Sequence, residues 1–261
     1  KDFLSNMAVN EIPGAFYSGF DSDIEFAVIP DPLDGEYKVA LQGTGQGEYT
    51  VDSAIYDAQG QVHAVTFTGN TDTNITVSYN LNYDSQQPQD ITIVPQDTEA
   101  PIISHIPLNS EYIINSAPIT FNFSSQDSGV GVFKLEATLN NQPITNGQVI
   151  TFNELGSYDI KIIATDFLGN IATQTVNFQV VYQFSGYLPP IKADGSGIYK
   201  LGRTLPVKFQ LTDANNQYIP TANAQLFAAK ISDGIAGNNE IPLSTSSADT
   251  GNISRYDQTE N

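Results

Sequence analysis

The chain has 261 residues, of which 40% are hydrophobic, and its 29 acidic and 10 basic residues give a formal net charge of -19. This charge argues against a nucleic-acid partner, because a phosphate backbone is bound by clustered Lys and Arg. The absence of cysteine excludes disulfides and thiolate metal sites, and no apolar run approaches the ~20 residues that span a bilayer.

The length fits two or three modules of ordinary domain size better than a single core. We predict an all-β chain of antiparallel β-sandwich modules over residues 1–95, 97–183 and 184–261, with residues 97–101 as the hinge between the first two. Because the chain begins at Lys1 and no signal peptide is visible, we expect an internal fragment of a longer, exported protein.

Two segments of the first module, residues 37–42 and 75–83, alternate between apolar and polar side chains as half-buried antiparallel strands do. Turns are predicted between them at residues 57–60 and 69–72, because Gly and Asn tolerate the positive φ angles of tight hairpins. The Gly-rich residues 43–47 lack the helix and Lys of a phosphate loop, so we predict a hairpin there.

The first module also carries EIPGAFYSG at residues 11–19, IPDPLDGEY at 29–37 and GTGQGEYT at 43–50. This stretch resembles a β-sandwich module found at the C-terminal side of secreted prokaryotic hydrolases and surface proteins. The resemblance implies an appendage to an active site in another domain. It also places the opening strand of the module upstream of Lys1.

Three acids near the start, Asp21, Asp23 and Glu25, have the one-apart spacing of oxygen ligands in calcium loops. An EF-hand would also need a Gly at the sixth place, where this chain has Phe26. In a strand, all three side chains would share one face, and we favour a solvated strand face over a calcium loop.

The second module has stronger strand signals, at residues 119–123, 133–139, 158–164 and 176–182. With residues 102–106 and 148–152, the pattern approaches the seven short strands of an immunoglobulin-like sandwich. The Cys and Trp landmarks of antibody domains are missing.

Three acidic segments of this module, DTEAP at residues 97–101, DSGVG at 127–131 and ATDFLGN at 164–170, together resemble the bacterial Ig-like domains of adhesins and other surface proteins. In that fold, the start of the first strand, the loop after the second strand and the loop before the last strand lie at one end. We therefore expect five side chains to converge where the first module joins: Asp97, Glu99, Asp127, Asp166 and Asn170.

Carboxylates held so close together repel, and Ca²⁺, which takes six to eight oxygen ligands, would relieve the repulsion and stiffen the joint. The alternative is that Asp127 and Asp166 are Asx-turn residues, which bond their own backbone. More generally, acids at turns either keep the chain soluble or bind cations.

The run FSGYLPP at residues 184–190 ends the second module and starts the third. After it, YKLGRTLPVKFQLTD at residues 199–213 resembles the Pro-x-Lys-Phe type of Ig-like domain of bacterial secreted proteins, and PVKF at residues 206–209 matches its name-giving motif. We predict one strand through residues 205–211, with Lys208 outward, and a second through 224–231. We expect the strands that complete the sandwich in that family to be missing after residue 231, either because the sequence stops early or because another segment supplies them. An incomplete sandwich leaves an unpaired edge open to strand addition.

No catalytic residue stands out, because the only histidines, His63 and His105, fall in different modules. We expect a non-catalytic stalk, spacer or interaction segment of a secreted or cell-surface protein, made rigid by calcium. Its partners would be other domains of the same polypeptide and a surface protein or glycan. The alternatives are the accessory tail of a secreted hydrolase, and a carbohydrate-binding module with Tyr79 and Tyr83 exposed on one face.

Overall fold

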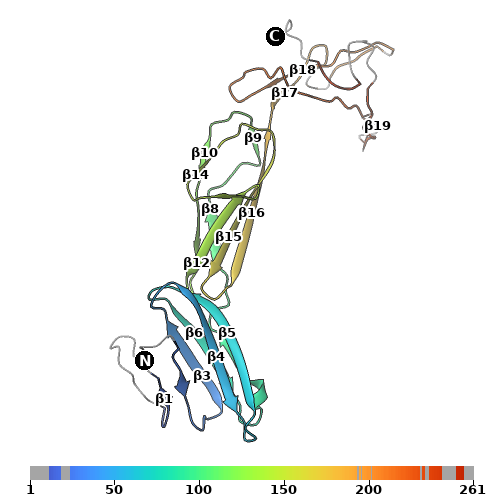
Figure 1. Cartoon of the computed structure of the whole chain (residues 1–261). Coiled ribbons are helices and arrows are strands. Elements are labelled where there is room, and N and C mark those ends of the chain that lie inside the picture. Colours follow the sequence, from blue (N-terminus) through green and yellow to red (C-terminus); the bar gives the residue numbers. More distant parts are fainter. Residues whose placement is uncertain are drawn as a thin grey trace. The chain divides into compact units, whose positions relative to one another are not determined.

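The computed structural model describes residues 12–18, 24–192, 194, 196–200, 202–229, 231–232, 235–242 and 251–255. The prediction of an all-β chain is confirmed, since the one helical element among these residues is a single 3₁₀ turn, η1 (Pro88–Asp90) (Figure 1). In chain order the strands are β1 (Phe16–Tyr17), β2 (Ala27–Val28), β3 (Gly35–Gln42), β4 (Gly47–Tyr56), β5 (Val62–Thr71), β6 (Thr76–Tyr83), β7 (Thr92–Pro95), β8 (Ile102–His105), β9 (Glu111–Ile113), β10 (Ile119–Phe121), β11 (Phe123–Gln126), β12 (Val132–Leu139), β13 (Gln142–Ile144), β14 (Gln148–Ile150), β15 (Gly156–Asp166), β16 (Ile171–Val181), β17 (Gln183–Leu188), β18 (Lys208–Thr212), β19 (Ile231–Ser232) and β20 (Ile235–Ala236).

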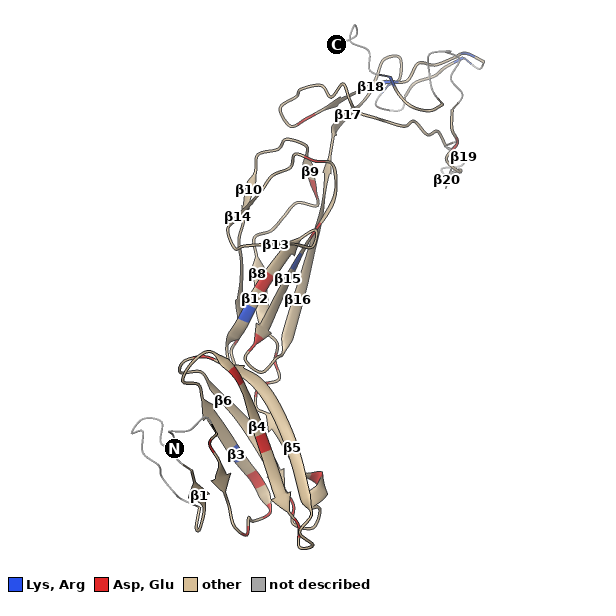
Figure 2. Ribbon diagram, viewed as in Figure 1, with Lys and Arg blue, Asp and Glu red and all other residues tan. Residues whose placement is uncertain are grey.

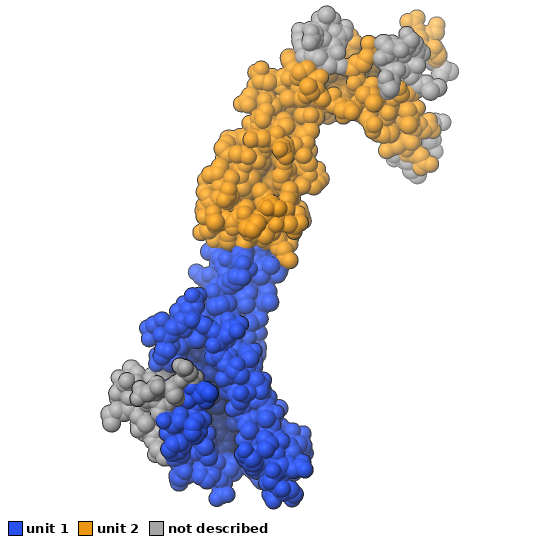
Figure 3. Space-filling view, in the orientation of Figure 1, with its two compact units in different colours: residues 1–104, 124–136, 162–174 blue, residues 105–123, 137–161, 175–261 orange. Residues whose placement is uncertain are grey.

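The chain forms two compact units, which Figure 3 colours separately. Unit 1 comprises residues 1–104, 124–136 and 162–174, and unit 2 comprises residues 105–123, 137–161 and 175–261. The segment predicted as the second module therefore contributes residues to both units.

Two of the sheets in unit 1 have the strand orders β3-β6-β7 and β4-β5. β3 and β6 pair along their whole length and confirm the strands predicted from alternation. The same alternation buries Val77 and Tyr79 of β6, which are 1% and 0% exposed. Phe67 of β5 packs on Tyr79 with ring centroids 4.8 Å apart, and the Tyr49 hydroxyl is hydrogen-bonded to the Tyr79 hydroxyl.

The core of unit 1 is completed by the loop between β15 and β16. Phe167, from this loop, is 6% exposed and belongs to the same buried cluster as Val77 and Tyr79. The Phe133 ring lies 5.4 Å from the Phe167 ring, and Asn70 N–H donates to the Phe167 carbonyl at 3.1 Å. The loop therefore packs on the sandwich of β3 to β7 through both apolar contact and a backbone hydrogen bond.

Two turn predictions in unit 1 are wrong. Residues 69–72 do not form a turn, because β5 continues to Thr71; Gly69 lies in the strand, where a Cβ would overlap the Tyr49 ring. Residues 43–47 do not close a hairpin, because β3 and β4 belong to different sheets. Gly43 instead exchanges backbone hydrogen bonds with Asn74 and Ile75, at 2.9 and 2.8 Å.

The largest sheet has the strand order β13-β12-β15-β16-β9, in which β9 runs parallel to β16. Its unit 2 portion packs an aromatic core in which Tyr112 stacks on Phe152 at 4.0 Å and Tyr158 stacks on Phe178 at 5.1 Å. The strand predicted over residues 119–123 is divided at Asn122, because β10 pairs with β14 whereas β11 pairs with β8.

Beyond residue 183 the described structure is sparser in strands. β17 pairs with β18, which begins at Lys208 and is shorter than the predicted strand. Residues 224–229 form isolated bridges, Gln225↔Ile253 and Ala228↔Glu240, in place of the predicted second strand.

Candidate cation site

A turn that starts with an aspartate recurs four times in the described residues. In each turn, the Oδ1 atom accepts the backbone N–H groups two and four positions later, at 2.8 to 2.9 Å. These bonds satisfy backbone donors that the loop would otherwise leave without a partner. The four aspartates are Asp57, Asp127, Asp166 and Asp213.

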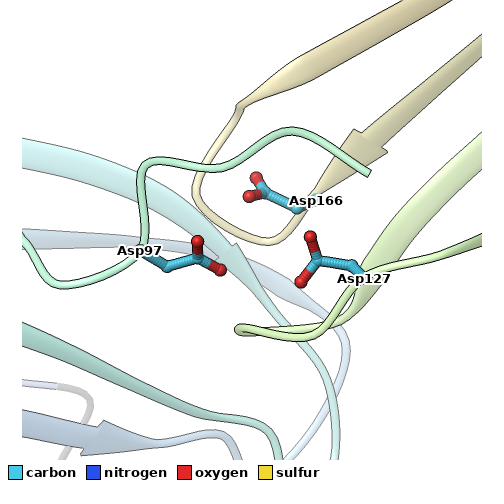
Figure 4. Close-up of side chains that lie close together, drawn as sticks. All are labelled: Asp97, Asp127 and Asp166. Atoms are coloured by element: carbon cyan, nitrogen blue, oxygen red, sulfur yellow. The ribbon is translucent and has the colours of Figure 1, made fainter. Parts of the chain in front are cut away.

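Two of these turns meet a third acidic segment within unit 1. One carboxylate oxygen from each of Asp97, Asp127 and Asp166 lies within 4.8 Å of the other two. Figure 4 shows the three side chains pointing toward one another from three separate segments. Asp166 is fully buried, whereas Asp97 and Asp127 are half-buried.

Backbone groups from two segments hold Asp97. Its Oδ2 accepts the Val130 N–H at 2.7 Å, and its Oδ1 accepts the Glu99 N–H at 3.1 Å. A Cβ on Gly129 would overlap the Asp97 carboxylate, so only glycine leaves room for this approach. The sequence pattern of residues 127–131 is typical of a turn, but it does not show that Gly129 is needed to leave room for the Asp97 carboxylate.

Asn170 links two of the segments through its side-chain amide. Its Nδ2 donates to Asp166 Oδ2 at 2.7 Å and to the Asp97 carbonyl at 3.3 Å. Its backbone N–H also donates to Asp166 Oδ1 at 2.8 Å. Asn170 thus acts here as a hydrogen-bond donor that orients the carboxylate of Asp166 and the backbone of Asp97.

The structure brings together four of the five predicted residues. Asp97, Asp127 and Asp166 converge, and Asn170 is bonded to two of them. Glu99 is exposed, and its carboxylate does not belong to the converging group. The Asx-turn alternative is also realised, since Asp127 and Asp166 bond their own loops through Oδ1.

The negative charge of the three aspartates favours the binding of a cation. Acidic residues, red in Figure 2, far outnumber basic ones along the chain. In the part that the structure describes, no Lys or Arg lies within ion-pairing distance of the three aspartates. The donors that reach them are backbone N–H groups and the Asn170 amide, and Asp127 Oδ2 accepts no hydrogen bond from any described group. A hard cation could bind these oxygens and complete its shell with backbone carbonyls and water.

The other candidates of the sequence lie elsewhere. Asp21 and Asp23 fall outside the described residues, and Glu25 is exposed and accepts a hydrogen bond from the Tyr17 hydroxyl. Burial, and then the Glu25 carboxylate, raises the pKa of Tyr17. Tyr79 is fully buried and cannot serve as an exposed sugar platform.

The two histidines have local partners. His63 Nε2 lies 3.0 Å from Asp57 Oδ2, and this contact, together with the Gln61 and Gln59 N–H groups, lowers the pKa of Asp57. His105 Nδ1 is hydrogen-bonded to the Ile106 carbonyl at 2.6 Å.

No family model and no curated protein sequence matches the chain. Within the described residues, we find no helix of the length and apolar character needed to traverse a bilayer.

Proposed function

We propose that this chain is a non-catalytic stalk or spacer segment of a secreted or cell-surface protein, stiffened by calcium bound to Asp97, Asp127 and Asp166. It would connect other domains of the same polypeptide and hold a surface protein or glycan contact at a fixed distance. The modules would be Ig-like, with a Pro-x-Lys-Phe type module after residue 184.

The convergence of three carboxylates from three separate segments is the observation that supports this proposal. One segment leads from β7 into β8, one follows β11, and one joins β15 to β16. A cation bound to all three would fix the loop that carries Phe167, which already packs against Val77 and Tyr79. Cation binding would therefore stiffen the connection around residues 97–101.

A distance measurement between two labels tests the proposal. The chain contains no cysteine, so a Gln59→Cys, Thr175→Cys double variant can carry two spin labels at exposed positions without any background labelling. We expect a narrow distance distribution in excess calcium and a broader one in chelator. Adding Asp127→Asn to the same labelled chain should leave the distribution broad under both conditions.

The control is a labelled chain that also carries Glu99→Gln. This change removes a negative charge from the same segment, but Glu99 lies outside the converging group, so calcium should still narrow the distribution. Equal widths in calcium and chelator for the parent labelled chain would overturn the proposal.

A further inference from the structure

The fourth aspartate turn, at Asp213, makes a contact within unit 2 that the sequence did not indicate. Asp213 is 4% exposed, and its Oδ2 accepts the side-chain amide of Asn115 at 3.0 Å. Its Oδ1 is occupied by the Asn215 and Gln217 N–H groups at 2.8 and 2.9 Å. The two oxygens thus divide between closing the turn and binding a residue 98 positions away in the chain.

The backbone of Ile114 extends this contact in both directions. Its N–H donates to the Val181 carbonyl at 2.8 Å, and its carbonyl accepts the Ala214 N–H at 3.0 Å. Val181 ends β16, and β17 begins two residues later with Gln183, which pairs with Thr212. The backbone of one residue therefore connects the end of the 97–183 segment to the Asp213 turn of the 184–261 segment.

Asn115 is held in the orientation that this contact needs. Its φ angle is +61°, in the left-handed region that Asn and Asp tolerate better than most residues. Its own N–H donates to the Phe152 carbonyl at 2.8 Å, and Phe152 is fully buried. The amide is presented to Asp213 from a backbone fixed to the core of unit 2.

We infer that the Asp213 turn and residues 113–116 form a clasp that joins the 184–261 segment to the 97–183 segment without a cation. A neutral amide binds Oδ2 at both turns, from Asn170 at Asp166 and from Asn115 at Asp213, but only at the Asp166 turn does the structure bring two further carboxylates close. The same turn thus serves two joints with different chemistry. The clasp is inferred from hydrogen bonds within unit 2 alone. Only the contrast with the calcium joint, which we define as the connection formed by Asp97, Asp127 and Asp166, rests on the proposed function.

Hydrogen exchange at single amides tests the clasp in the full chain. The reporter is the Ala214 amide, which donates to the Ile114 carbonyl. The variant Asn115→Asp suits the left-handed backbone but places a carboxylate opposite Asp213 Oδ2. Since a hydrogen bond to a charged group is lost and a like charge is added, protection of Ala214 should fall by roughly ten- to a hundredfold.

A charge swap distinguishes the clasp from a general need for Asn115. In the double variant Asn115→Asp, Asp213→Asn, the new amide at position 213 can still accept the turn N–H groups through its oxygen and can donate to the new carboxylate at position 115. We expect protection of Ala214 to return to within about threefold of the parent chain. The control Asn216→Asp makes the same chemical change at an exposed side chain of the same turn, also in the left-handed region at a φ angle of +60°, and should leave the protection of Ala214 unchanged.

Every outcome decides the inference. Unchanged protection of Ala214 in Asn115→Asp overturns the clasp, as does a swap variant that fails to restore the protection. If Asn115→Asp does not fold, a folded swap variant supports the clasp and an unfolded one overturns it. In calcium and chelator, Ala214 should be equally protected, and a change there would also overturn it. The Asn70 amide, which donates to the Phe167 carbonyl, reports the calcium joint separately, so the proposed function can fail while the clasp stands.

Discussion

Replacing Asp127 by Asn should change the stability of unit 1 in opposite directions with and without calcium. Two unit charges 4.8 Å apart repel by about 0.9 kcal/mol in water and by about 3.5 kcal/mol at an effective dielectric constant near 20. The variant removes two of the three pairwise repulsions and keeps an oxygen that can accept the Gly129 and Gly131 N–H groups. Because the backbone donors already offset part of the repulsion, we expect a gain of about 1–3 kcal/mol in chelator.

Calcium should reverse this order. A cation at a thousandfold excess over its Kd stabilises the parent chain by about 4.1 kcal/mol, which exceeds the gain of about 1–3 kcal/mol expected for the variant in chelator. At about 2–4 °C per kcal/mol, the thermal midpoint of the parent chain should rise by several degrees, whereas that of the Asp127→Asn variant should rise much less. Thermal unfolding followed by circular dichroism, with protection of the Asn70 amide as a local reporter, measures both effects.

Two matched variants separate charge from turn chemistry in this experiment. Asp57→Asn alters an aspartate turn with the same backbone bonds outside the cluster, and Glu99→Gln removes a charge from an exposed side chain. Neither should show the reversal. A parent chain that unfolds identically in calcium and chelator would refute the cation site, and an Asp127→Asn variant no more stable than the parent in chelator would refute the repulsion argument.

Three further predictions concern neighbouring contacts. Gly129→Ala should destabilise unit 1 by about 1–3 kcal/mol and reduce the rise of the thermal midpoint in calcium, because the added Cβ displaces the Asp97 carboxylate. Gly45→Ala, with no atom within 4 Å of its Cβ, should have neither effect in the same unfolding assay. The Asn115 amide, followed by the Gln217 N–H, lowers the pKa of Asp213, so the contribution of the Asp213 carboxylate to stability should be complete above the ordinary carboxyl pKa and should be lost as the pH falls through the lowered value. Urea midpoints between about pH 2 and 5 should show this loss of stability, and the Asp213→Asn variant should not show it. A pH profile that is the same in the variant and the parent chain would contradict the assignment. Burial raises the pKa of Tyr49 and of Tyr79, so folding should be favoured below the ordinary tyrosine pKa of about 10 and should lose this contribution at higher pH. Absorbance titration should show at least two of the 13 tyrosines ionising only as the near-UV circular dichroism is lost, and normal titration of all of them in the folded chain would contradict this.

Strand positions were predictable wherever one face of a strand is buried. In β6 the inward residues Val77 and Tyr79 alternate with polar ones, and the pairing with β3 follows the pattern residue by residue. The turn predicted at residues 69–72 was wrong because Gly69 is a strand residue of β5 that makes room for the Tyr49 ring of β4. A sequence pattern cannot distinguish a glycine with this role from a glycine in a turn.

The acidic cluster was predictable in outline because an assumed strand order brings distant loops to one end of a sandwich. Asp97, Asp127 and Asp166 do lie together, whereas Glu99, two residues from Asp97, does not. Spacing could not exclude Glu99, since its orientation depends on a loop backbone that follows no regular period. The bond between Asn115 and Asp213 was beyond sequence pattern altogether, because it joins two loops through tertiary packing.

The burial of Phe167 also affects how unit 1 folds and how it unfolds under force. Since this ring is buried with Val77 and Tyr79, the sandwich of β3 to β7 obtains part of its interior from a loop that follows it by some 70 or more residues, and it cannot reach full stability until that loop has been synthesised. The same dependence implies that unit 1 unfolds cooperatively under a pulling force. Pulling the Phe167 loop away would break the connection around residues 97–101 and expose the core of the β3 to β7 sandwich to water in the same step.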